Sequence, residues 1–140
     1  MIKIAFVCTG NTCRSVMAER ILKKLSDQDK SIKVSSRGIY ATGENISPMA
    51  KKVLKSHHIS AANRKSVKLG KIDKNTLYVV MNNQMKICIP GGKVISFEDL
   101  MAEPIADPYG KDEQAYQLTF DQLSMGIKIL LEKIKKWREI

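Results

Sequence analysis

The N-terminal residues 1–15, MIKIAFVCTGNTCRS, join an apolar run to a polar loop and the start of a helical pattern. Residues 2–7 are almost all apolar, which is typical of a strand buried on both faces of a parallel sheet. The loop that follows contains Gly10, and from about residue 15 to 25 apolar side chains recur three and four positions apart. The stretch therefore predicts a strand, a tight loop and a helix, the order from which parallel α/β sheets are built.

Three more strands are expected along the chain, separated by helical or irregular segments. They are the apolar runs 32–36, 77–81 and 94–97. Alternating strands and helices with short connections predict one parallel sheet covered by helices, in a single domain that spans residues 1–140. In such sheets, ligands bind beyond the carboxyl ends of the strands.

Three helices are expected besides the first. One begins at Ser47-Pro48, where the serine hydroxyl caps free amides and the proline occupies the first helical position. A short helix covers 82–87, and Asp112 caps a long final helix. The apolar stripe of that final helix is Phe120, Leu123, Ile127, Leu130, Ile134 and Trp137.

Composition places the chain among ordinary globular proteins. Of its 140 residues, 44% are hydrophobic and 27% charged. We expect no membrane span and no signal peptide, because no apolar run is long enough. Its three cysteines, Cys8, Cys13 and Cys88, match no disulfide framework, so we expect a reducing, cytoplasmic location.

The chain is basic, with a formal net charge of +10. Basic residues cluster near the C-terminus without interleaved aromatic residues, so we interpret the cluster as the solvated face of an amphipathic helix. We therefore expect a monomer without a nucleic-acid or membrane partner, whose positive field favours anionic substrates such as phosphorylated proteins. The cluster consists of Lys128, Lys133, Lys135, Lys136 and Arg138.

The loop after the first strand has the chemistry of an anion site. A loop that curls into a helix N-terminus points several backbone N–H groups at one place, where the helix dipole adds positive potential. Gly10 and Asn11 tolerate the left-handed backbone that such a loop requires, and the planar fork of Arg14 binds two phosphate oxygens. The same groups favour a nucleophilic thiolate on Cys8, to which Ser15 donates a hydrogen bond. The alternative is a structural cysteine near a surface arginine, but the position between strand and helix favours catalysis.

A carboxylate later in the chain complements this loop. Asp107 lies in the stretch Asp107-Pro108-Tyr109, which read alone is a common turn. Together with a nucleophilic Cys8, it supplies the general acid that a leaving group needs. Tyr109 offers an aromatic wall to a substrate side chain.

The CTGNTCRS loop and the Asp-Pro-Tyr stretch together resemble the low-molecular-weight protein tyrosine phosphatase family over the whole chain. The resemblance implies a doubly wound α/β domain with a four-stranded parallel sheet of order 2-1-3-4, flanked by helices. It implies a protein phosphatase in which Cys8 forms a phosphocysteine, and Asp107 acts as acid and then activates the water that releases inorganic phosphate. No metal or cofactor is implied, because an arginine and the loop amides neutralise the phosphoryl oxygens. The implied phosphate- and substrate-binding residues are Thr9, Gly10, Asn11, Thr12, Cys13, Arg14, Ser15 and Tyr109.

The chain departs from the family pattern at several positions. Val16 stands where the family usually has proline, and Gly110 replaces a second aromatic residue after the Asp-Pro-Tyr stretch. Asn63 is matched to a histidine that often supports the loop. His57 and His58 are interpreted as solvent-facing residues at a helix end.

Three other functions use a similar loop. An arsenate reductase passes oxidation through two further cysteines, but Met81 stands in place of the first, so we interpret Cys88 as a core thiol. A phosphocarrier subunit of a sugar transport system has no use for Arg14 or Asp107. A phosphopeptide-binding module that has lost catalysis is disfavoured, because Cys8, Arg14 and Asp107 are all present.

Thr12 bears on the choice of substrate. Tyrosine-specific members of the family commonly have isoleucine here, whereas members with the run CTGNTCRS resemble protein arginine phosphatases, and Gly110 is similar to that group. A threonine hydroxyl can accept a hydrogen bond from the guanidinium of phosphoarginine. Phosphoarginine is therefore the favoured substrate and phosphotyrosine the alternative.

The same resemblance implies a redox role for Cys13. A sulfenic acid formed on Cys8 can be captured by a neighbouring thiol before it oxidises further. We therefore predict a reversible Cys8–Cys13 disulfide under peroxide.

Overall fold

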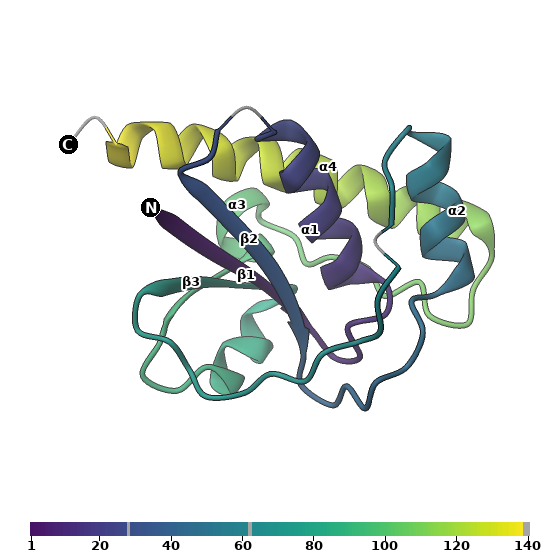
Figure 1. The fold of residues 1–140 in the computed structure, drawn as a ribbon, viewed down its shortest axis with the longest axis horizontal. Helices are drawn as coiled ribbons and strands as arrows, with labels where there is room; N and C mark the ends of the chain where they lie inside the picture. Colours follow the sequence, from purple (N-terminus) through teal and green to yellow (C-terminus); the bar gives the residue numbers. More distant parts are fainter. Residues whose placement is uncertain (28, 62, 139–140) are drawn as a thin grey trace.

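A parallel sheet of four strands lies at the centre of the fold (Figure 1). The computed structural model describes residues 1–27, 29–61 and 63–138. The strand order is β2-β1-β3-β4, as the family resemblance implied, so β1 has a hydrogen-bonded neighbour on each side. The strands are β1 (Ile2–Cys8), β2 (Ile32–Gly38), β3 (Thr76–Val80) and β4 (Lys93–Ser96).

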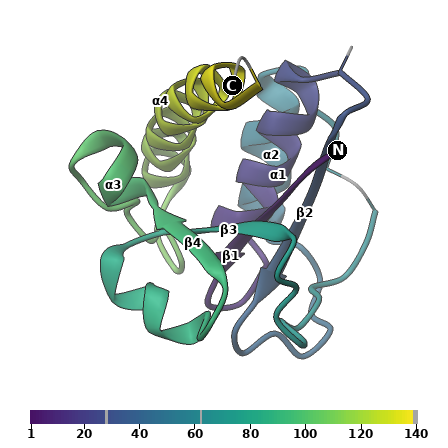
Figure 2. The same ribbon diagram turned by 90° about the vertical axis from the view of Figure 1, so that its left-hand side faces the viewer.

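Helices cover the sheet unequally. The long helices lie together on one side, and η1 and irregular segments lie on the other (Figure 2). The predicted caps are confirmed: Ser47 Oγ accepts the N–H of Ala50 at 3.3 Å, and Asp112 Oδ1 accepts that of Ala115 at 3.0 Å. The helices are α1 (Arg14–Leu25), α2 (Pro48–Ser56), the 3₁₀ helix η1 (Asn83–Cys88), α3 (Phe97–Met101) and α4 (Glu113–Arg138).

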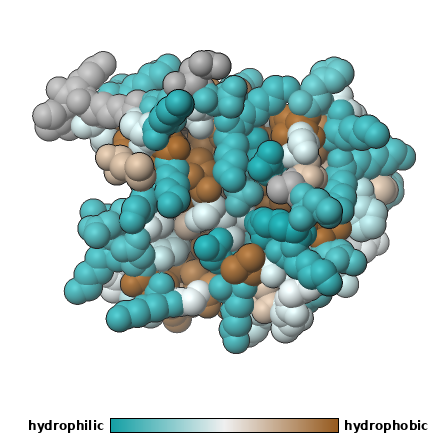
Figure 3. Space-filling view, viewed as in Figure 1, coloured by the Kyte–Doolittle hydropathy of each residue, from teal (hydrophilic) through white to brown (hydrophobic). Residues whose placement is uncertain are grey.

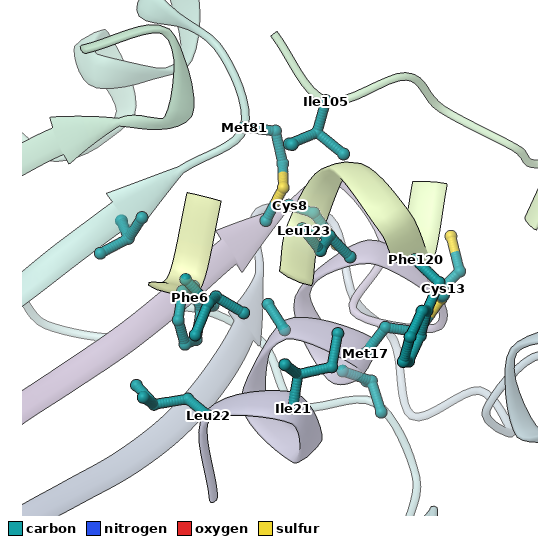
Figure 4. Close-up of a cluster of buried hydrophobic side chains, with 14 of the residues drawn as sticks. Phe6, Cys8, Cys13, Met17, Ile21, Leu22, Met81, Ile105, Phe120 and Leu123 are labelled. Carbon is teal, nitrogen blue, oxygen red and sulfur yellow. The ribbon is translucent and has the colours of Figure 1, made fainter. Parts of the chain in front are cut away.

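Side chains of β1 alternate between two buried clusters, which is the reason for its unbroken apolar sequence. Ile4, Phe6 and Cys8 belong to the larger cluster beneath the long helices, and Ala5 and Val7 belong to the smaller cluster on the opposite face. Figure 4 shows Phe6 and Cys8 among apolar residues of the larger cluster. The strand therefore holds the Cys8 backbone rigidly where the sheet ends and the loop begins.

The predicted fourth strand ends one residue too late, and a helix was missed. Phe97 begins α3 because Ser96 and Asp99 form a reciprocal capping box, in which each side chain accepts the backbone N–H of the other residue. The apolar run 94–97 concealed this helix start. The signal in the sequence is the S-x-x-D pattern of residues 96–99.

The predicted stripe of α4 is wrong at its last member. The other five members of the stripe are buried, but Trp137 is 45% exposed. In Figure 1 the C-terminal end of α4 runs past the end of the sheet, so the turn after Ile134 has little core to cover. Much of the surface that faces the viewer in Figure 1 is hydrophilic (Figure 3). Of the basic cluster, the side chain of Arg138 lies outside the described residues.

Cys88 is not a core thiol. It is half-buried at the end of η1, a helix in which no residue is fully buried. The interpretation failed because a 3₁₀ helix at the sheet surface cannot bury every apolar side chain that its short sequence contains.

Candidate active site

The loop between β1 and α1 forms part of the wall of a cleft of about 650 Å³. Carbonyl oxygens of this loop accept hydrogen bonds from neighbouring segments. Cys8 O and Thr9 O accept N–H groups from residues 39 and 40 at 3.0 and 2.8 Å, and Thr12 O accepts the Ser47 N–H at 2.8 Å. Within the described part of the chain, the amides of Thr9, Gly10, Thr12 and Cys13 donate to no protein acceptor. A concave loop with several unused N–H groups at a helix N-terminus is suited to bind an anion.

Gly38 allows the neighbouring strand to lie against this loop. It pairs with Cys8 in the sheet. A Cβ atom at this position would lie 2.7 Å from the carbonyl carbon of Gly10 and 2.8 Å from the backbone nitrogen of Asn11. Any larger residue would therefore push the loop out of shape, since backbone atoms cannot turn aside as a flexible side chain can.

The sulfur of Cys8 is surrounded by hydrogen-bond donors. Its Sγ lies 2.9 Å from Ser15 Oγ and 3.3 Å from the backbone N–H of Asn11. Asn11 reaches this position with a φ of 57°, in the left-handed region predicted for the loop. The N–H of Asn11 donates to the sulfur, and the Ser15 hydroxyl is the donor whenever the sulfur carries no proton.

Arg14 lines the cleft and keeps one side-chain donor without a described protein partner. Its Nη1 donates to the carbonyl of Ile105 at 3.2 Å, and its Nη2 lies 3.6 Å from Asp107 Oδ2. Its Nε is buried and has no partner among the described residues. A buried donor that stays unpaired costs about 1–3 kcal/mol, so an oxyanion that accepts this N–H would contribute to binding.

The loop that carries Asp107 is hydrogen-bonded both to the residue after β3 and to α4. Ile105 N–H donates to the carbonyl of Met81 at 3.1 Å, and Ala106 N–H donates to Gln122 Oε1 at 2.9 Å. The side chain of Asp107 is 52% exposed, and Tyr109 is 77% exposed. Both residues line the same cleft as Cys8, so the structure brings together the two segments that sequence analysis paired.

Cys13 is a buried thiol on the same loop. Burial, and after it the negative charge on Cys8, raises the pKa of Cys13 to about 12. Figure 4 shows Cys13 next to Phe120 of α4, and both belong to the larger core cluster. Cys13 is therefore protonated at neutral pH.

Comparison with known proteins decides the family. The model of the low molecular weight phosphotyrosine protein phosphatase family matches residues 3–139. The chain belongs to this family.

Named relatives of this phosphatase fall into two groups. A protein-arginine-phosphatase of Geobacillus stearothermophilus is 35% identical over 144 residues, which cover 95% of this chain and 96% of that protein. The low molecular weight protein-tyrosine-phosphatase PtpB of Staphylococcus haemolyticus (strain JCSC1435) is 34% identical over 129 residues, which cover 86% of this chain and 91% of that protein.

The fold of the phosphatase is also that of solved relatives. The structure of a YwlE arginine phosphatase mutant with a phosphorylated active-site serine has a TM-score of 0.88 to this chain at 28% identity, covering 99% of each. In that protein, the residue at the active site has received a phosphoryl group.

The eight predicted phosphate- and substrate-binding residues take two different places in the phosphatase. Thr9, Gly10, Thr12, Cys13, Arg14 and Tyr109 line the cleft. Asn11 and Ser15 are fully buried. Their side chains lie behind the loop and contact Cys8 or its supports rather than the cleft.

The support of the loop comes from Arg64, and the match of Asn63 to a supporting residue is wrong. Asn63 is exposed, whereas Arg64 Nη1 donates to Asn11 Oδ1 at 3.1 Å. Arg64 also contacts two buried polar residues, Ser36 and Glu19. Ser36 was detectable, because it shares the buried face of β2 with Val34. Arg64 comes from an irregular segment and carries no local signal.

Sequence analysis also missed part of the cleft wall. Glu44, Ser47 and Tyr116 line it, and the Ser47 hydroxyl lies 3.1 Å from Tyr116 Oη. Burial raises the pKa of Tyr116, which keeps its hydroxyl neutral. The N–H of Thr42 and then the hydroxyl of Ser66 lower the pKa of Glu44 to about 2, so a fixed negative charge lies at the cleft.

His57 is not simply solvent-facing. It is half-buried, and its ring stacks on Phe120 with the ring centroids 4.0 Å apart. Its Nε2 lies 3.0 Å from Gln117 Oε1. His57 therefore joins the end of α2 to α4, whereas His58 is exposed as expected.

Proposed function

We propose that residues 1–140 form one phosphatase domain that dephosphorylates protein side chains through a phosphocysteine on Cys8. The observation that carries this proposal is that Cys8, the loop with the unused amides and Arg14, whose Nε has no protein partner among the described residues, all line one cleft. The amides and the guanidinium bind the phosphoryl oxygens and stabilise the charge that builds up on them. No metal or cofactor has a task in this scheme, since these groups supply the positive potential.

The reaction has two steps. The Cys8 thiolate forms a bond to phosphorus while the bond from phosphorus to the substrate side chain breaks, and Asp107 gives its proton to the leaving group. Asp107 then takes a proton from water as the water oxygen bonds to phosphorus. The S–P bond breaks, which releases inorganic phosphate and regenerates the thiolate.

Phosphoarginine is the substrate that we favour, with phosphotyrosine as the alternative. Thr12 lines the cleft and its hydroxyl is able to accept an N–H of a guanidinium, while Asp107 adds a carboxylate nearby. Gly110 leaves the wall beyond Tyr109 without a side chain. The named relatives include phosphatases of both kinds at nearly equal identity, so their names do not decide between the two substrates.

The test compares turnover of one peptide sequence carrying either phosphoarginine or phosphotyrosine. We expect a higher kcat/KM for phosphoarginine in the natural protein. Hydrogen bonds to charged groups are worth about 1.5–3 kcal/mol, so Thr12→Ile should lower the ratio of the two kcat/KM values by about tenfold to a hundredfold. Thr9→Ile is the matched control, because it makes the same change at the other threonine of the loop.

Two results would contradict parts of the proposal. An unchanged ratio in Thr12→Ile removes Thr12 from substrate choice, and an equal change in Thr9→Ile assigns the effect to general distortion of the loop. Failure of both peptides to lose phosphate would overturn the function itself. Cys8→Ser should abolish turnover while inorganic phosphate still binds.

The setting of the enzyme is part of the same proposal. We place it in the cytoplasm as a monomer whose partners are phosphorylated proteins, not nucleic acid or membranes. Cys8, Cys13 and Cys88 are all free thiols, which suits a reducing compartment. Within the described residues, no helix is both long and apolar enough to cross a membrane.

A further inference from the structure

A groove of about 680 Å³ lies between α2 and the segment that follows it, outside the catalytic cleft. Two lysines and an imidazole contribute to its walls, and none of its described lining residues is acidic. None of them lines the cleft that contains Cys8. The proposed reaction therefore leaves this second concave surface without a task. The lining residues are Lys51, Lys55, His58, Ile59, Ser60 and Ala61.

The positive charge of the groove is not balanced by neighbouring carboxylates. Within the described residues Lys51 and Lys55 have no ion pair, whereas Lys52 between them lies 3.1 Å from Glu113 Oε2. Like charges four positions apart on a helix face repel each other and destabilise the helix. Lys55 lies in the last turn of α2, where the helix dipole favours a cation, but Lys51 lies one turn earlier and has no such compensation. An anion bound between the two lysines would remove their repulsion.

The wall of the groove opposite α2 is held in place by two cations of α1. Lys24 Nζ donates to the carbonyls of His57 and His58, each at 3.1 Å. Arg20 Nε donates to the carbonyl of Ser60 at 2.7 Å. Neither cation has a carboxylate partner among the described residues, so both add to the positive potential behind the groove. A groove that is already formed loses little conformational freedom when a ligand binds, which favours affinity.

The groove begins about one helical turn from the catalytic cleft. Pro48, at the start of α2, lines the cleft. Lys51 and Lys55 follow it by three and seven residues, which is about 5 and 10 Å along the helix axis. An extended peptide advances about 3.3 Å per residue. A chain whose phosphorylated side chain is in the cleft therefore reaches the groove about three to six residues away.

Acidic side chains of a peptide fit the groove better than a nucleic acid does. Its described lining residues include no Phe, Tyr or Trp on which a base could stack. Lys51 and Lys55 are about 6 Å apart along the helix axis, and alternate side chains of an extended peptide are about 7 Å apart. Two carboxylates on alternate residues are therefore spaced to meet both ammonium groups.

We propose that the groove of Lys51, Lys55 and His58 is a docking site for acidic residues of a phosphorylated protein, about three to six positions from the phosphorylated residue. The inference rests on the proposed function, because it takes the partner to be a phosphorylated protein. It adds a second point of attachment outside the cleft. Substrate choice then depends on the sequence around the phosphorylated residue as well as on that residue.

The test compares three phosphopeptides of one length that carry the phosphorylated residue the enzyme turns over. Two carry glutamates three to six positions away, on the N-terminal or on the C-terminal side, and the third carries glutamines on both sides. One of the glutamate peptides should have a kcat/KM about threefold to tenfold above that of the glutamine peptide at low salt, as expected of two exposed ion pairs. Lys51→Glu/Lys55→Glu should abolish this preference.

Lys133→Glu/Lys136→Glu is the matched control, because it changes the net charge by the same amount elsewhere. Both lysines are exposed and lie near the C-terminal end of α4, which in Figure 1 is at the opposite end of the molecule from α2. This variant should keep the preference for glutamate. An equal loss in the two double variants would assign the preference to net charge and overturn the proposal. Equal kcat/KM for all three peptides would overturn it as well.

A second measurement requires no turnover. Each glutamate peptide is added without its phosphoryl group, at millimolar concentration, and the amide NMR signals of residues 51–61 are followed. One peptide should shift these signals in the natural protein but not in Lys51→Glu/Lys55→Glu. Absence of such shifts would overturn the docking site, and tighter binding of a single-stranded oligonucleotide in the groove would overturn it in favour of nucleic acid. If the signals shift but no peptide loses phosphate, the proposed function fails while the groove still binds acidic segments.

Discussion

Asp107 and Cys8 line the same cleft from distant parts of the chain, and their proposed roles as acid and nucleophile predict a dependence on the leaving group. Asp107→Ala should slow hydrolysis of phenyl phosphate by about 10²- to 10⁴-fold, because this leaving group needs a proton. Hydrolysis of nitrophenyl phosphate should slow much less, since nitrophenolate leaves without one. The measurement is kcat on both substrates.

Asp121→Ala is a suitable control for that experiment, since Asp121 is an exposed carboxylate on α4 that bonds to Gln117. Equal losses on the two substrates in Asp107→Ala would remove Asp107 from the acid role.

At the same scale, Cys13 should protect Cys8 from irreversible oxidation. The charge of Cys8 helps to keep Cys13 protonated, so converting that thiolate to an uncharged sulfenic acid removes one cause of the raised pKa of Cys13. Burial, the larger cause, remains, and capture should therefore compete with further oxidation at high peroxide. We expect activity lost at low peroxide to return with dithiothreitol, and peptide mapping to find a Cys8–Cys13 disulfide.

In Cys13→Ser the recovery should be lost, whereas Cys88→Ser should behave like the natural protein because Cys88 does not line the cleft that contains Cys8 and Cys13. Sulfinic acid on Cys8 without the disulfide would contradict the protective role.

At the scale of elements, the contact of β2 with the catalytic loop is tight enough to test with one methyl group. Gly38→Ala should distort the loop, and misplacement by about 1 Å can lower kcat/KM about a hundredfold. The measurement is kcat/KM on nitrophenyl phosphate together with the thermal midpoint. Gly70→Ala is the control, because nothing lies within 4 Å of a Cβ at that position. Unaltered kinetics in Gly38→Ala would show that the loop yields without consequence.

The hydrogen bond between Ser66 and Glu44 should make the free energy of unfolding depend on pH. The folded protein holds the pKa of Glu44 at about 2, below its usual 4.5. This stabilisation is present above about pH 4.5 and is lost as pH falls toward 2. Ser66→Ala removes one cause of the shift, so its free energy of unfolding should fall less between pH 5.5 and 3.5 than that of the natural protein.

Urea unfolding at the two pH values measures this difference, and NMR titration of the Glu44 carboxyl checks its cause. Ser60→Ala, at an exposed serine, should show the natural pH dependence. An unshifted titration of Glu44 in Ser66→Ala would assign the low pKa to the backbone contacts alone.

The elements that sequence analysis predicted are those whose signals are local. The apolar run of β1, the cap at Ser47 and the cap at Asp112 each depend on a few adjacent residues, and the structure confirms them. The start of α3 was missed because an apolar Phe97 reads as a continuation of a strand. Arg64 could not be predicted at all, since its contacts with Asn11 and Glu19 arise only when an irregular segment packs beside the first helix.

At the scale of the whole molecule, charge should govern encounter with substrates. The net charge of +10 attracts acidic phosphopeptides over a distance that salt reduces to about 10 Å at 0.1 M ionic strength. We expect kcat/KM for an acidic phosphopeptide to fall several-fold between 20 and 200 mM salt. A basic peptide of the same length should show little fall or a rise. Equal salt dependence of the two peptides would show that the net charge plays no part in encounter.

The hydrogen bond between Arg14 and the Ile105 carbonyl joins residues 91 positions apart. Because synthesis runs from the N-terminus, Cys8 and Arg14 leave the ribosome well before Ile105 and Asp107. Until the later loop has been made, Cys8 lacks the Asp107 side of its cleft and has the reactivity of an unfolded cysteine, which is mostly protonated at neutral pH. The growing chain thus carries a chemically quiet thiol, and we expect the proposed nucleophile to become active only after residue 107 has joined the fold.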